Sequence, residues 1–159
     1  MLACETALEW LVPTTVLRQI PIPAGGTVEG SAQVMWPQFN GALQAKVTPA
    51  DCSDDIAWPI ALFDLLVAHN DRKDDNWGVI DALPRAVLID NGHAFGNPTT
   101  NSPFCARFQG QQIPPDYVAR LQTFRNGATT SRLWEFLPDA EMRALLARAD
   151  ALLNSGTFA

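Results

Sequence analysis

Four polar residues in the middle of the chain have the side chains that a metal–phosphate site needs. Asp71 and Asn76 lie in one polar run, and Asp90 follows the next apolar stretch. Two carboxylates and an amide are hard oxygen ligands, suited to a Mg²⁺ ion that completes its shell with water and nucleotide phosphates. Lys73 is the fourth polar residue and lies between the first two. A solvated polar turn without chemistry would use the same residue types, because Asp and Asn are common in turns.

A β-hairpin is predicted between the polar run and Asp90. Residues 77–80 and 86–89 are two short apolar runs that flank a turn rich in Asp and Pro. A hairpin centred on Leu83 places Asn76 opposite Asp90, and directly opposed residues lie about 4.5–5.5 Å apart. The hairpin therefore brings both groups to its open end, beside the loop that carries Asp71.

Helices must position this hairpin. Apolar residues from Ile56 to Val67 recur at steps of four, three and four, which predicts a helix over 54–69 that ends where the polar run begins. Pro138-Asp139 predicts the start of another helix, and Pro114-Pro115-Asp116 predicts the start of a third, around residues 117–124. Residues 130–136 are a weaker helical segment. Before residue 54 we expect, in chain order, a helix over 2–10, a strand over 14–17, a turn over 20–26, a strand over 30–36 and a linker over 37–41.

Composition bounds the class of protein. The chain has 159 residues with 47% apolar and 18% charged, which fits a single globular domain. A net charge of −6 argues against a broad electrostatic surface for nucleic acid or for an anionic membrane. We expect a cytoplasmic protein, because no signal peptide or membrane-spanning run is evident. Three scattered cysteines fit reduced thiols better than a disulfide framework or a metal ribbon.

The spacing of these residues resembles the protein-kinase-like superfamily. Asp71-Arg72-Lys73-x-x-Asn76, followed fourteen residues after Asn76 by an Asp-Asn-Gly element that starts at Asp90, is similar to its catalytic loop and metal-binding motif. The Asn-Asp-Arg opening resembles the phosphatidylinositol 3-/4-kinase and HipA-like branch. The resemblance covers about residues 1–96 and is sharp over 68–96.

The resemblance implies a role for each matching residue. Asp71 would be the catalytic aspartate, which positions or deprotonates an acceptor hydroxyl. Lys73 would neutralise charge on the transferring phosphoryl group, and Asn76 and Asp90 would hold Mg²⁺. Arg72 is expected to be a structural partner of a carboxylate or a backbone carbonyl. The implied reaction transfers the γ-phosphoryl group of ATP to a lipid head group, a protein Ser or Thr, or a small alcohol.

The same resemblance implies a fold and a nucleotide site. The fold would be α+β and kinase-like over 1–159, with an N-lobe remnant over 1–36 (a helix and two or more strands), a hinge over 37–41 and a mostly helical C-lobe over 42–159. The side chain of Glu5 would face the nucleotide. The hinge backbone would meet adenine at four residues: Gln33, Val34, Met35 and Trp36.

Two features of a complete kinase do not precede Glu5, namely a glycine-rich phosphate loop and a strand lysine. The resemblance therefore implies a truncated or decayed relative. Two other classes stay open: a nucleotide- or partner-binding module without turnover, and a metal-dependent phosphohydrolase. A homodimer or a separate N-lobe partner also stays open, because remnant strands would leave unpaired edges.

Overall fold

The computed structural model describes residues 8, 11–34, 36–80, 85–95 and 99–158. Within them the chain is α+β, with two small antiparallel sheets and five α-helices. The predicted helix over 2–10 lies outside the described residues. None of the described helices is long and apolar enough to cross a lipid bilayer.

Helix α3 (Asp54–Val67) confirms the central helix of the sequence analysis. Ten of its fourteen residues are buried, so the helix is enclosed by the core rather than lying on its surface. It ends because Ala68 adopts the left-handed conformation (φ 49°), and the next amide, of His69, donates to Asp64 O at 2.9 Å. This reversal sends the chain directly into the polar run. Ser53 occupies the N-cap position, but its side chain makes no capping hydrogen bond.

A three-stranded sheet has the order β3-β4-β5. Its first strand, β3 (Phe39–Gly41), precedes α3 in the chain, and β4 (Trp77–Ile80) and β5 (Arg85–Leu88) follow α3. The predicted hairpin is confirmed, but its predicted register is wrong by one residue. Trp77 lies opposite Leu88, so the register places Asn76 opposite residue 89 rather than opposite Asp90. Burial explains the shift, because a one-residue slip moves side chains to the other face, and Trp77 and Leu88 are both fully buried.

The predicted linker over 37–41 is also wrong in part, because it contains β3. This strand pairs with β4 and sets Gly41 opposite Gly78. An added Cβ at Gly78 would meet the backbone oxygen of Asn40 and the ring of Phe39, so the close approach of β3 requires glycine there. The short helix α2 (Ala42–Ala45) then follows β3 directly.

The remaining helices pack around α3. They are α4 (Pro103–Phe108), α5 (Pro115–Gly127) and α6 (Asp139–Ser155). The starts predicted for α5 and α6 are confirmed, and Gly156 ends α6 in the left-handed conformation. The weaker helical segment 130–136 forms 3₁₀ turns, at Ala128–Thr130 and Arg132–Glu135, instead of an α-helix. Trp58 of α3 stacks on Phe108 with ring centroids 4.0 Å apart, which joins α3 to α4.

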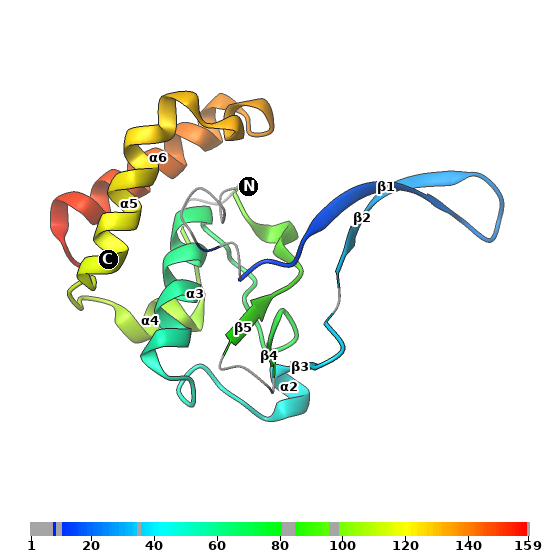
Figure 1. Cartoon of the computed structure of the whole chain (residues 1–159), viewed down its shortest axis with the longest axis horizontal. Helices are drawn as coiled ribbons and strands as arrows, with labels where there is room; N and C mark the ends of the chain where they lie inside the picture. The colour runs from blue at the N-terminus through cyan, green and yellow to red at the C-terminus, as the bar shows by residue number, and fades with distance from the viewer. Residues whose placement is uncertain (1–7, 9–10, 35, 81–84, 96–98, 159) are drawn as a thin grey trace.

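A second sheet consists of β1 (Thr15–Pro21) and β2 (Thr27–Gln33) alone. In Figure 1 this ribbon projects away from the body, on the side opposite α5 and α6. β1 overlaps its predicted strand but continues through Ile20 and Pro21, which were predicted to lie in the turn. β2 begins and ends three residues before the strand predicted over 30–36. Several large apolar side chains of the ribbon are exposed, at Val16, Ile20 and Val28.

Candidate functional site

A buried ion pair lies beneath the polar run. The guanidinium of Arg72 faces the carboxylate of Asp64 on α3, with Nη2 to Oδ1 at 2.9 Å and Nε to Oδ2 at 3.2 Å. Neither side chain is exposed to solvent. Charges are buried in proteins when they are paired and hydrogen-bonded, and the planar guanidinium suits this two-point contact. The expectation that Arg72 is a structural partner is therefore confirmed.

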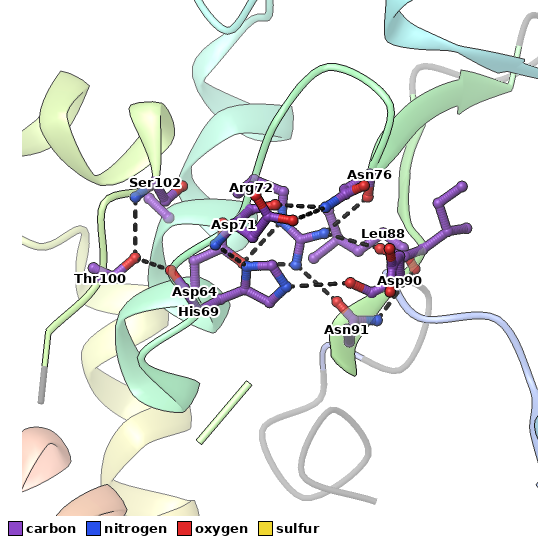
Figure 2. A network of polar contacts seen from close by, with 12 residues as sticks. Asp64, His69, Asp71, Arg72, Asn76, Leu88, Asp90, Asn91, Thr100 and Ser102 are labelled. Atoms are coloured by element: carbon purple, nitrogen blue, oxygen red, sulfur yellow. Dashed lines mark hydrogen bonds and ion pairs between the residues drawn. The ribbon is translucent and has the colours of Figure 1, made fainter. Parts of the chain in front are cut away.

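Arg72 also joins the two turns that carry the candidate ligands (Figure 2). Its Nη1 donates to the carbonyl oxygens of Asn76 at 2.8 Å and of Ile89 at 3.1 Å. Its Nη2 donates to Oδ1 of Asn91 at 2.7 Å. One buried side chain thus holds residue 76 on the first turn and residues 89 and 91 on the second.

His69 forms a second link between the same turns. The amide of Asp71 donates to His69 Nδ1 at 3.3 Å, and His69 Nε2 lies 3.3 Å from Asp90 O. Because Nδ1 accepts, Nε2 must carry the proton and donate. His69 is fully buried, and burial, together with the nearby Arg72 charge, lowers the pKa of its imidazole below the ordinary 6.5. The imidazole is therefore neutral near pH 7, the form that makes both bonds.

Asp71, Lys73 and Asn76 lie together in the first turn. Asn76 Nδ2 donates to Asp71 O and lies 3.4 Å from Asp71 Oδ2. Lys73 Nζ is 3.3 Å from Asp71 Oδ2, and its hydrogen bond to Asp71 is the main reason that the pKa of that carboxyl is lowered. Asn76 is buried, whereas Lys73 is exposed. The structure therefore brings together three of the predicted site residues.

Asp90 occupies the start of the second turn. Its backbone is left-handed (φ 49°), and its side chain is exposed. The Asp90 charge contributes to raising the pKa of Lys73, although Asp71 contributes more. The backbone contact with His69 therefore fixes the position of residue 90, and Lys73 lies in the electric field of both carboxylates. The exposed carboxylate of Asp90 can reach a ligand that approaches from solvent.

The predicted nucleotide-contacting residues lie at the base of the ribbon or outside the described residues. Gln33 Nε2 donates to Thr15 Oγ1 at 2.9 Å, and the Val34 amide donates to Thr14 O at 3.0 Å. Trp36 is half-buried, and its carbonyl accepts from the Phe39 amide. Met35 and Glu5 lie outside the described residues. The backbone amide of Val34 therefore already donates a hydrogen bond within the protein.

The two turns carry carboxylate and amide oxygens, at Asp71, Asn76 and Asp90, which are donor types that Mg²⁺ accepts. In the part of the chain that is described, no three His, Cys, Asp or Glu side chains form a cluster able to hold a metal. Mg²⁺ needs only one or two protein carboxylates when phosphates and water supply the other ligands.

Sequence reasoning missed three residues of this network: Asp64, His69 in its bridging role, and Asn91. Asp64 had a visible signal, because it is the only charged residue in the apolar run from Trp58 to Val67. A carboxylate inside a buried helix requires a partner. His69 and Asn91 had no comparable signal, since their contacts depend on how the chain folds back after α3.

Comparisons with known proteins found no relative of this chain. No family model matches the chain, and no curated protein and no solved structure matches it.

Proposed function

We propose that the chain is a kinase-like phosphotransferase that binds Mg²⁺-ATP and transfers the γ-phosphoryl group to a hydroxyl acceptor. The proposal includes a protein-kinase-like arrangement, in which the polar run is the catalytic loop and the turn at Asp90 is the metal-binding element. The observation that supports it most strongly is the double link of these two turns, by Arg72 and by His69.

This arrangement suits phosphoryl transfer because that reaction depends mainly on positioning and charge compensation. Asn76 and Asp90 would hold Mg²⁺, and the Lys73 ammonium would face the phosphoryl oxygens. The lowered pKa of Asp71 keeps its carboxylate ionised but makes it a weak base. Asp71 would therefore orient the acceptor hydroxyl by accepting its hydrogen bond, rather than remove its proton early.

Thermal unfolding with ATP, with and without Mg²⁺, tests nucleotide binding. We expect Mg²⁺-dependent stabilisation of several degrees, since a ligand that binds only the folded state raises the melting temperature. Asp90→Asn should abolish this shift. Asp71→Asn should keep the shift and lose transfer of radiolabelled γ-phosphate. Asp74→Asn is the matched control, because Asp74 is an exposed carboxylate of the same turn. Unchanged melting of the wild-type protein would contradict the proposal.

A second candidate is a nucleotide-binding module without turnover. It is favoured by the engagement of the Val34 amide with Thr14 O, which removes one backbone donor from the expected adenine contact. Under this alternative, Mg²⁺-ATP still stabilises the protein and Asp90→Asn still abolishes the shift. No acceptor then receives labelled phosphate, and Asp71→Asn changes nothing that can be measured.

A further inference from the structure

Four hydrogen bonds hold His69 within the described residues, and one of them comes from outside the two turns that carry the candidate ligands. The ring of His69 contacts the Asp71 amide and the Asp90 carbonyl, and its own amide donates to Asp64 O. The fourth bond is on the His69 carbonyl oxygen, which accepts from Thr100 Oγ1. In Figure 2, Thr100 lies on one side of His69 and Asp90 on the other. The position of His69 therefore depends on a residue that the proposed function does not use.

The direction of the Thr100 hydroxyl is set by two neighbours. Its oxygen accepts from the Ser102 amide at 3.1 Å. A hydroxyl has a single proton, and here that proton is donated to His69 O. Ser102 and His69 are both buried, so loss of the hydroxyl would leave an amide and a carbonyl of two buried residues without this partner.

The amide that holds this hydroxyl is attached to the elements behind the site. Ser102 is the N-cap residue of α4. Phe104 of that helix packs edge-on against Trp77 of β4, with ring centroids 5.0 Å apart. Cys105 Sγ donates to Ala61 O of α3 at 3.3 Å. The start of α4, and with it the threonine hydroxyl, is therefore fixed by contacts with both α3 and β4.

We infer that Thr100 is a positioning residue of the proposed site. Its hydroxyl fixes the backbone of His69, so that the imidazole reaches the Asp71 amide and the Asp90 carbonyl together. Without the hydroxyl, the peptide group that follows His69 can rotate. The two turns then keep the Arg72 link but lose the constraint on the imidazole. The effect on nucleotide binding rests on the proposed function, whereas the effect on the His69 contacts does not.

Amide hydrogen exchange on the full chain tests the positioning without nucleotide. Thr100→Val removes the hydroxyl and keeps the shape of the side chain. The Asp71 amide should then exchange about three- to tenfold faster, because its bond to His69 Nδ1 opens more often. Thr100→Ser keeps the hydroxyl and should restore slow exchange. The Leu133 amide, which donates to Ser131 Oγ, is the internal control and should not change. Unchanged exchange at Asp71, or an equal increase at Leu133, would overturn the inference.

Binding of Mg²⁺-ATP tests the consequence for the site. Thr100→Val should raise the dissociation constant by about three- to tenfold, and Thr100→Ser should bind like the wild-type protein. Ser131→Ala is the matched control, because it also removes a hydroxyl that bonds a backbone amide, at 3.0 Å. It should lower the melting temperature without changing the dissociation constant.

The outcomes separate this inference from the proposed function. Wild-type affinity in Thr100→Val would overturn the inference and leave the proposed function intact. A wild-type protein that does not bind Mg²⁺-ATP would contradict the proposed function, and the exchange of the Asp71 amide then decides the role of Thr100. Both measurements are repeated on Thr100→Ala, so that a folding defect specific to valine does not decide the result.

Discussion

The two antiparallel hairpins of this protein differ in what holds them in place. The β1–β2 ribbon has seven residue pairs, yet Val16 and Val28 on one of its faces are 37% and 47% exposed. Within the described residues, three pairs join β4 to β5, but Trp77 and Leu88 are fully buried. The shorter hairpin is also connected to α3 by the Asp64–Arg72 pair. Burial and buried polar contacts, rather than the number of paired residues, therefore distinguish the hairpin that carries the candidate chemistry.

The largest expected effect comes from breaking the buried ion pair. Asp64→Leu leaves the Arg72 guanidinium buried without its counter-charge, and it should reduce the free energy of unfolding by about 3–5 kcal/mol. Denaturant unfolding measures this change.

The control for that substitution is Asp150→Leu. Asp150 pairs with Arg125 at 2.6 Å, but the two side chains are 42% and 38% exposed, so we expect a loss below about 1 kcal/mol. The double variant Asp64→Leu/Arg72→Leu should recover part of the loss, because no unpaired charge remains. Equal losses for the buried and the exposed pair would show that Arg72 does not hold the two turns.

Gly78→Ala should have the next largest effect. The added methyl group would collide with the Asn40 backbone, and such overpacking costs about 1–3 kcal/mol of unfolding free energy. Gly41→Ala is the matched control, since Gly41 is the partner of Gly78 in the register and an added Cβ there meets nothing within 4 Å. If both variants were equally stable, β3 would not approach β4 as closely as described.

A smaller effect concerns pH. The pKa of His69 is lowered in the folded protein, so the unfolded chain binds the proton more readily. The stability that neutral His69 provides is complete above pH 6.5, the ordinary value, and falls as the pH decreases toward the lowered folded value. Melting temperatures measured from pH 7.5 down to about pH 5 should therefore fall more steeply in the wild-type protein than in His69→Gln. Parallel curves would show that protonation of His69 does not contribute to the pH dependence of stability.

The smallest effect should come from the ribbon. Val28→Thr changes a side chain that is 47% exposed, so the free energy of unfolding should change by no more than about 0.5 kcal/mol. A loss similar to that of Gly78→Ala would mean that this face is covered in the folded protein, which would remove the contrast between the two hairpins.

Some of this structure could be predicted from local patterns. The apolar spacing of α3 and the proline–aspartate starts of α5 and α6 were sufficient, because these signals lie within each element. The register of β4–β5 could not be predicted in this way. A turn shorter by one residue changes every pair, and core packing selects the register that forms.

The network of the site was predictable only in part. Asp71 and Asn76 lie in one turn, so their proximity follows from the sequence. The pairing of Asp64 with Arg72 requires the left-handed reversal at Ala68, which no pattern in the sequence signals. The same reversal brings His69 to the backbone of Asp90.

The most direct test of the central claim is whether one divalent ion contacts both turns. Mn²⁺ added in trace amounts with ATP should broaden the NMR amide signals of Asn76 and Gly92 together, because paramagnetic broadening acts only at short range. The Gly30 signal on the ribbon should stay sharp. Broadening confined to one turn, or equal broadening of Gly30, would contradict a shared site at Asn76 and Asp90.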